Sequence, residues 1–156
     1  MNIVIRDATI DDAMVVADFN SRLAEETEGR PLAANKIGPG VAALLSDANR
    51  GRYWLAIVND EIAGQIMVTY EWSDWRNGML WWIQSVYVSR KFRRRGVFSA
   101  LYKHVESLAR ADEHSCGLRL YVEKSNGRAR DIYRTLGMVE PGYLVMEAIF
   151  SDVRNS

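Results

Sequence analysis

Hydrophobic residues near the start of the chain recur every three or four positions, which is the spacing of one face of a helix. A short apolar strand at residues 2–6 comes first, and residues 16–23 then follow the helical spacing. Thr9 and Asp12 stand ahead of this helix at the spacing of a capping box. A second, shorter helix is predicted after Pro39, where the apolar spacing resumes. The first 50 residues therefore predict one strand and two helices.

The middle of the chain changes to an apolar and polar alternation, which is the period of a strand. Residues 53–58 and 62–72, with the turn-forming residues Asn59 and Asp60 between them, predict an antiparallel hairpin. Asn77 and Gly78 form a dipeptide that is preferred in tight turns, and a third strand is expected at residues 79–88. Three successive strands predict a sheet.

After Gly96 the period returns to about 3.6 residues, which predicts a long amphipathic helix. A strand at residues 118–122, a helix at 126–136 and a last strand at 143–150 are expected to follow. A strand, helix and strand in succession join parallel strands. The predicted fold class is therefore α/β, with a mixed central β-sheet and helices on both faces, in a single domain that spans residues 1–156.

Composition and charge narrow the partners that this fold can have. The 20 basic and 20 acidic residues cancel, so no overall field attracts the chain to nucleic acid or to a membrane. Cys116 is the only cysteine, which excludes an internal disulfide and is typical of a reducing compartment. His104 and His114 lack the spacing of metal ligands, and no metal is expected. Without a long apolar run or a leader-like start, a cytoplasmic location is expected.

Positive charge is nevertheless concentrated in one segment, KFRRRG at residues 91–96, between a predicted strand and a predicted helix. The first turn of a helix carries free N–H groups and a partial positive charge, and a phosphate placed there binds both. Gly96 allows such a ligand to approach the backbone closely. The segment predicts an anion site, although a solvated helix start would have the same pattern.

Two motifs resemble the GCN5-related N-acetyltransferase (GNAT) superfamily. VYVSRKFRRRGVFSALY resembles its acyl-CoA-binding pattern Gln/Arg-x-x-Gly-x-Gly/Ala, with Arg93, Gly96 and Phe98 at the patterned positions. NGRARDIYRTLGM resembles the family's Asn-x-x-Ala-x-x-x-Tyr-x-x-x-Gly-Phe, in which the matching residues are Asn126, Ala129, Tyr133 and Gly137, with Met138 for Phe. The cofactor motifs lie within residues 79–138. Residues 1–50, where the resemblance would place the acceptor side, match the family only in the order of elements.

The resemblance implies that acetyl-CoA is the co-substrate. Its binding residues would be Val86, Tyr87, Val88, Arg93, Arg94, Arg95, Gly96, Val97, Phe98, Ser99 and Asn126. In the family the pantetheine arm pairs with the backbone of the strand before the phosphate loop, here at Val86 and Val88. Phe98 replaces a small residue of the motif, and we expect its side chain to turn inward, in step with Leu101.

The same resemblance places the hydroxyl of Tyr133 at the cofactor sulfur, where it would protonate the departing thiolate; a core tyrosine is the alternative. The general base is less clear, because residues 79–89 contain no carboxylate. Gln84 or Ser85 could hold a water that relays the proton, and Glu71 could be a distant base. Glu26 and Glu71 are also the candidates for binding a cationic acceptor, although solvated surface charges would have the same pattern.

The function that the resemblance implies is acetyl-CoA-dependent N-acetyl transfer to a primary amine of a small molecule or a peptide. The alternative is a non-catalytic acyl-CoA-binding sensor of the same fold, which the missing strand carboxylate permits. A nucleic-acid-binding module is not expected, because few aromatic residues interleave the basic segment. The sequence leaves open whether the chain forms a homodimer.

Overall fold

A computed structural model describes residues 1–150 and divides the chain into two compact units, Met1–Tyr121 and Val122–Ser156. The strands are β1 (Ile3–Asp7), β2 (Arg52–Val58), β3 (Glu61–Ser73), β4 (Gly78–Val88) and β5 (Ser115–Leu120). The helices are α1 (Ala13–Glu28), α2 (Ala34–Leu45), α3 (Val97–Ala111) and α4 (Gly127–Thr135). All five strands belong to the first unit, and α4 belongs to the second.

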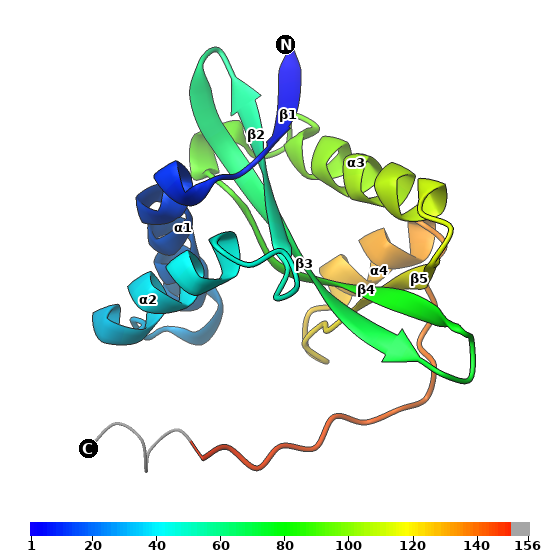
Figure 1. Ribbon diagram of the computed structural model, residues 1–156. Helices are drawn as coiled ribbons and strands as arrows, with labels where there is room; N and C mark the ends of the chain where they lie inside the picture. Colours follow the sequence, from blue (N-terminus) through cyan, green and yellow to red (C-terminus); the bar gives the residue numbers. More distant parts are fainter. Residues whose placement is uncertain (151–156) are drawn as a thin grey trace. The chain divides into compact units, whose positions relative to one another are not determined.

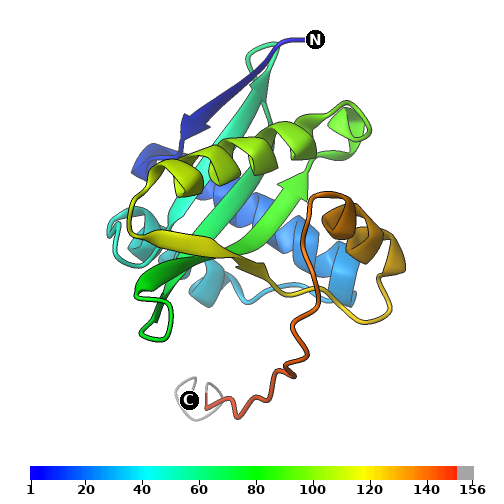
Figure 2. The same cartoon turned by 90° about the vertical axis from the view of Figure 1, so that its right-hand side faces the viewer.

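The strands form one mixed sheet in the order β1-β2-β3-β4-β5. The pairs β1–β2, β2–β3 and β3–β4 are antiparallel. The pair β4–β5 is parallel, and α3 connects its two strands. Figure 1 shows α1 and α2 on one face of this sheet and α3 on the other. Figure 2 shows α3 crossing in front of the strands. The predicted α/β fold with a mixed sheet and helices on both faces is confirmed.

The strand β2 is buried on both faces because helices cover both. Tyr53 and Leu55 pack against Val16 of α1 and Val41 of α2. Trp54 points to the opposite face, and its ring stacks on that of Trp81 at 6.4 Å between centroids. A strand that is covered on both sides is apolar along its whole length, which accounts for the run YWLAIV.

The start of α1 is tied to the sheet through Asp12. The predicted capping box is present: Thr9 N–H donates to the Asp12 carboxylate at 2.8 Å, on a single 3-10 turn that precedes α1. Arg6 of β1 donates two further hydrogen bonds to the same carboxylate, both at 2.9 Å. These bonds, those from Arg6 above all, hold the pKa of Asp12 below its usual value.

Two sequence predictions about elements are wrong. The helix α2 begins at Ala34 and contains Pro39, because its apolar stripe packs on the core and outweighs the local proline signal. Residues 143–150, predicted as a last strand, have no regular secondary structure and expose their apolar side chains. A strand requires a hydrogen-bonded neighbour, and the sheet contains only β1 to β5.

Candidate active site

A β-bulge interrupts β4 at Ser85. Met67 of β3 pairs with Gln84, whereas Gln65, two residues away, pairs with Tyr87, three residues further along β4. Ser85 has a φ of 51°, in the left-handed region, and its carbonyl accepts a hydrogen bond from the Gln65 amide at 3.0 Å. The extra residue lets Gln84 and Tyr87 face the same side of the sheet, although side chains three residues apart point to opposite sides in a regular strand.

Beyond the bulge, β4 has an open edge on the side away from β3. The strand β5 pairs with β4 only as far as Ile83, opposite Leu120. The Ser89 amide donates to β3 at 2.8 Å, so the alternation of an antiparallel ladder turns the backbone groups of Val86 and Val88 away from β3. A row of backbone donors and acceptors of this kind can pair with an extended ligand.

The start of α3 has a backbone geometry that can bind an anion. Gly96 precedes the helix with a φ of 83° and, as a glycine at the N-cap position, supplies no side-chain cap, and Arg94 has a φ of 62°. Successive free N–H groups in such a turn form a concave nest. Gly64 of β3 brings this turn close to the sheet, because a Cβ there would lie 3.3 Å from Val97 and 2.8 Å from the Tyr87 carbonyl.

Glu26 of α1 binds two arginines of the loop between β4 and α3. Its carboxylate accepts from Arg93 at 2.7 Å and from Arg90 at 3.0 Å. Burial alone would raise the pKa of Glu26, but these bonds outweigh it, and the pKa lies below its ordinary value. Arg93 also donates to the carbonyl of Val88 at 2.8 Å. The loop is thus attached both to α1 and to the edge of β4.

The remaining cations of the loop differ in how they are engaged. Lys91 forms an ion pair with Glu61. Arg94 and Arg95 are exposed, and neither has an acidic partner among the residues that the structure describes. Two guanidinium groups are therefore available to an anion at the start of α3.

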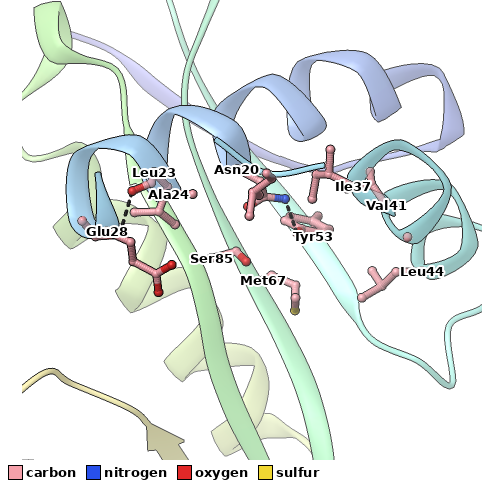
Figure 3. Close-up of a pocket in the computed structure, with 13 residues that line it drawn as sticks. Asn20, Leu23, Ala24, Glu28, Ile37, Val41, Leu44, Tyr53, Met67 and Ser85 are labelled. Carbon is pink, nitrogen blue, oxygen red and sulfur yellow. Dashed lines mark hydrogen bonds between the residues drawn. The ribbon is translucent and has the colours of Figure 1, made fainter. Parts of the chain in front are cut away.

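A cleft of about 360 Å³ lies between α1, α2 and the sheet (Figure 3). Its lining residues are Asn20, Leu23, Ala24, Thr27, Glu28, Leu32, Ile37, Gly40, Val41, Leu44, Tyr53, Met67 and Ser85. Ser85 connects the cleft to the open edge, because the next residue, Val86, presents its backbone there. A ligand in the cleft and one on the β4 edge would therefore approach each other at the bulge.

Buried polar side chains join the cleft to the bulge. Asn20 donates to the Tyr53 hydroxyl at 2.9 Å, and Gln65 donates to the Asn20 carbonyl at 3.0 Å. The second acceptor of the Gln65 amide is the Ser85 carbonyl. Burial raises the pKa of Tyr53, which keeps its phenol neutral at physiological pH.

The structure does not bring the two predicted acceptor carboxylates together. Glu71 accepts from the Trp82 indole at 3.0 Å and from Arg119 at 2.7 Å. Glu71 lies opposite Leu80 of β4, whereas Glu26 contacts Tyr87, and that separation along the strand is roughly 20 Å. Both carboxylates already have arginine partners.

Gln84 and Phe98, two other predicted site residues, are both partly buried. Gln84 donates its amide hydrogen to the Thr69 hydroxyl of the neighbouring strand. Phe98 turns only partly inward, with its ring 6.1 Å from that of Tyr102, one turn further along α3. Val97, 1% exposed, takes the fully buried place at the start of the helix.

The second unit contains the remaining predicted residues. Asn126 caps α4, because its side-chain oxygen accepts from the amide of Ala129 at 3.1 Å, as predicted. Gly137, with a φ of 91°, follows the end of the helix as expected. Tyr133 is half-buried on α4, and burial raises its pKa, so the phenol is protonated at neutral pH. The roles of Asn126 and Tyr133 at a cofactor stay predictions.

Sequence reasoning missed Asn20, Tyr53 and Gln65. A signal for two of them exists in the sequence. Asn20 lies four residues after Val16, on the apolar side of α1, and Gln65 interrupts the apolar run of β3. A polar residue on a buried face must be hydrogen-bonded there, and such positions are candidates for site residues.

Neither a metal centre nor a membrane span is present in the described part of the chain. No three His, Cys, Asp or Glu side chains within residues 1–150 are close enough together to hold a metal ion. Over the same residues, none of the helices combines the length and the apolar character needed to cross a membrane.

Comparisons with known proteins identify the family and the fold. The sequence profile of the acetyltransferase (GNAT) family matches residues 18–138. A possible acetyltransferase from Clostridium difficile 630 is 45% identical, with a TM-score of 0.89 over 96% of this chain and 99% of that one. A search of curated proteins found no match.

Two more distant structures share the fold. A predicted acetyltransferase from Clostridium acetobutylicum, solved with acetyl-CoA, is 15% identical, with a TM-score of 0.77 over 94% of this chain and 96% of that one. An aminoglycoside acetyltransferase from an uncultured soil sample, in complex with sisomicin, is 13% identical, with a TM-score of 0.74 over 95% of each chain.

Proposed function

We propose, since the chain belongs to the acetyltransferase (GNAT) family, that it transfers the acetyl group of acetyl-CoA to a primary amine of a small molecule or a peptide. The observation that carries this proposal is the open edge of β4 beyond Ile83, beside the uncapped and basic start of α3. These two features suit the two halves of an acyl-CoA, an amide-containing arm and a set of phosphates.

The phosphates would bind the backbone amides at Gly96, Val97, Phe98 and Ser99, with the guanidinium groups of Arg94 and Arg95 beside them. The arm would pair with the outward backbone groups of Val86 and Val88. Since Arg93 already donates to the Val88 carbonyl, the Val88 amide and the groups of Val86 are the ones open to a ligand. The distant relative solved with acetyl-CoA supports the choice of co-substrate.

In the net reaction, the amine nitrogen bonds to the acetyl carbon, the carbon–sulfur bond breaks, and the products are an amide and the CoA thiol. One proton leaves the nitrogen and one is added to sulfur. Acetyl-CoA supplies the activated thioester. We propose that the protonated phenol of Tyr133 donates the proton to sulfur, and that the Val86 amide stabilises the developing oxyanion by about 3 kcal/mol.

The amine must lose a proton before it attacks, since an alkyl ammonium has a pKa of about 10.4. Ser85 lines the cleft at the point nearest to the open edge, and it is our first candidate for holding a water that takes this proton. Gln84 is the second, although its amide already binds Thr69. Glu26 and Glu71 stay candidates for acceptor binding, in competition with the arginines that they already bind.

A non-catalytic acyl-CoA sensor is the second candidate function, because no carboxylate occupies β4. One experiment separates the two. CoA and acetyl-CoA should raise the melting temperature under either function, because both bind only the folded chain. Release of CoA thiol with an amine panel is expected only from the enzyme. No thermal shift at millimolar CoA would overturn both. The single domain over residues 1–156, the cytoplasmic location and the homodimer stay predictions.

A further inference from the structure

We propose that the acceptor is an amine with one positive charge and an apolar body, bound in the cleft between α1, α2 and the sheet. This inference rests on the proposed acetyl transfer, and it adds the chemical class of the acceptor. It is carried by the chemistry of the cleft wall.

The wall is mainly apolar, with one charged residue and four uncharged polar side chains, those of Asn20, Thr27, Tyr53 and Ser85. The Thr27 hydroxyl donates to the Leu23 carbonyl of its own helix at 2.8 Å. Leu23, Ile37 and Leu44 represent the aliphatic side chains contributed by α1 and α2. Glu28 is the only lining residue, within the described chain, whose side chain carries a formal charge. Figure 3 shows Glu28 at one end of the cleft, the apolar residues of α2 at the other, and Ser85 between them.

The single carboxylate limits the charge of the ligand to one cation. A second ammonium group would lie against aliphatic side chains, where an unpaired charge is strongly disfavoured. Two other acidic residues stand in this helix segment, but Glu26 is already bound by two arginines and Glu25 does not line the cleft. A phosphorylated amine would place its negative charge near Glu28, and repulsion would weaken its binding.

The polar group of the cleft has little capacity for hydroxyl groups. Asn20 is 7% exposed and Tyr53 is 3% exposed. Asn20 binds Tyr53 and Gln65, and Gln65 binds Ser85 in turn. An amino sugar would lose its hydrogen bonds to water, which costs free energy, because the amide hydrogens of Asn20 and Gln65 are engaged. The Gln65 oxygen has no partner within residues 1–150, but Gln65 is 0% exposed and does not line the cleft.

Size and position complete the assignment. The volume of about 360 Å³ is within the range of small-molecule pockets. The nitrogen must come close to the bulge at Ser85, because the thioester would lie on the β4 edge beside it. The ammonium therefore belongs between Glu28 and Ser85, with the apolar body extending toward Ile37 and Leu44.

The first experiment compares kcat/KM for hexylamine, spermidine and glucosamine at saturating acetyl-CoA. We expect hexylamine to exceed both others by about 10-fold or more, the effect of one or two well-buried methylene groups. An equal or higher value for spermidine or glucosamine would overturn the inference.

Variants test whether the preference for hexylamine arises in the cleft. Ile37→Asp should lower kcat/KM for hexylamine by about 10-fold or more, since it places a charge against the apolar body. The KM for acetyl-CoA should be unchanged. Leu32→Asp, at a position 39% exposed, serves if Ile37→Asp does not fold. Met14→Asp is the control, because it adds the same charge to α1 at a position 88% exposed and outside the cleft. Equal losses in the control and the cleft variant would contradict the assignment.

Calorimetry on the CoA-loaded protein separates this inference from the proposed function. Hexylamine could bind, and bind more weakly to the Leu32→Asp variant, without being acetylated. This result would support the proposed class of ligand and refute the acetyl transfer. Acetylation of spermidine or glucosamine in preference to hexylamine would refute only the acceptor class. No binding of hexylamine at millimolar concentration would also refute the class.

Discussion

The proposed cofactor side and the proposed acceptor side of this site are built in different ways. Apart from Asn126 and Tyr133, the proposed cofactor side is one continuous segment, residues 84–99, and it presents mainly backbone groups and two arginines without an acidic partner in the described chain. The acceptor side is a cleft lined by side chains from α1, α2, β2, β3 and the bulge in β4. A motif can encode the first, because its groups are neighbours along the chain. The second exists only where packing brings distant segments together.

The helix α1 contributes to both sides. Leu23 and Thr27 line the cleft, whereas Glu26 binds Arg90 and Arg93 of the cofactor loop. Asn20 and Ala24, like Leu23 and Thr27, are four positions apart and share the helix face that lines the cleft. Glu26 does not line the cleft, and its carboxylate reaches the loop after β4. The two sides are therefore attached to one rigid element, and mutations can test how independent they are.

The largest effect is expected from Gly96→Val, which should weaken CoA binding and leave acceptor binding unchanged. A β-branched residue is strained at a φ of 83°, so the loop must change and move its amides. The Kd for CoA should rise about 10³-fold, the equivalent of two charge-assisted hydrogen bonds. Binding of hexylamine should be little affected. Isothermal titration calorimetry measures both.

Gly29→Val is the matched control for this change. Gly29 has a φ of 72° at the end of α1, and a Cβ added at either glycine would meet no other atom within 4 Å, so the strain is similar. CoA affinity should survive in Gly29→Val. Unchanged CoA affinity in a folded Gly96→Val protein would mean that the phosphates bind elsewhere.

Tyr133→Phe should affect the chemical step and neither binding side. Removal of the hydroxyl should slow single-turnover acetyl transfer by roughly 10²-fold, the contribution of a positioned general acid. The Kd for CoA should change little. Tyr143→Phe is the control, since Tyr143 is 72% exposed in the same unit. A wild-type rate, together with a loss of about 1 kcal/mol in stability, would instead assign Tyr133 to a structural hydrogen bond.

Glu26→Gln tests whether α1 supports the cofactor side. If the carboxylate positions Arg90 and Arg93, the KM for acetyl-CoA should rise by up to about 10-fold, the value of one charged hydrogen bond. If it only neutralises them, its loss should tighten CoA binding, because two cations become free. A rise in the KM of the amine alone would restore the predicted role at the acceptor. Glu25→Gln is the control, since no ion pair to Glu25 is present within residues 1–150.

The smallest effect concerns acid and the start of α1, the helix that supplies one wall of the cleft. The pKa of Asp12 is lowered in the folded state, so its stabilisation is complete above the ordinary aspartate pKa of about 4. It is lost as the pH falls through the lower folded-state value. Asp12→Asn should cost about 1 kcal/mol at pH 7 through the capping box, and the difference from wild type should shrink below pH 4. Urea unfolding measures the free energy of unfolding of both proteins. A difference between them that stays constant from pH 7 to pH 2 would contradict this prediction.

Local features of the sequence were sufficient for most of the fold. The period of the apolar residues indicated the five observed strands and the four helices, although it placed the start of α2 too late, and Thr9 with Asp12 marked the start of α1. The loop motif marked the uncapped helix start at Gly96. Each of these depends on residues that are close in the chain, so the physical cause is contained in the sequence read locally.

Only the tertiary structure decided which charges are free and where an acceptor can bind. Five cations in one segment look alike in the sequence, but Glu26 and Glu61 neutralise three of them and leave Arg94 and Arg95. The bulge at Ser85 depends on the register between β3 and β4. The cleft beside it depends on how α2, which continues through Pro39, packs on the sheet. Ion pairing and packing are long-range in sequence, because they depend on distances in space that no local period records.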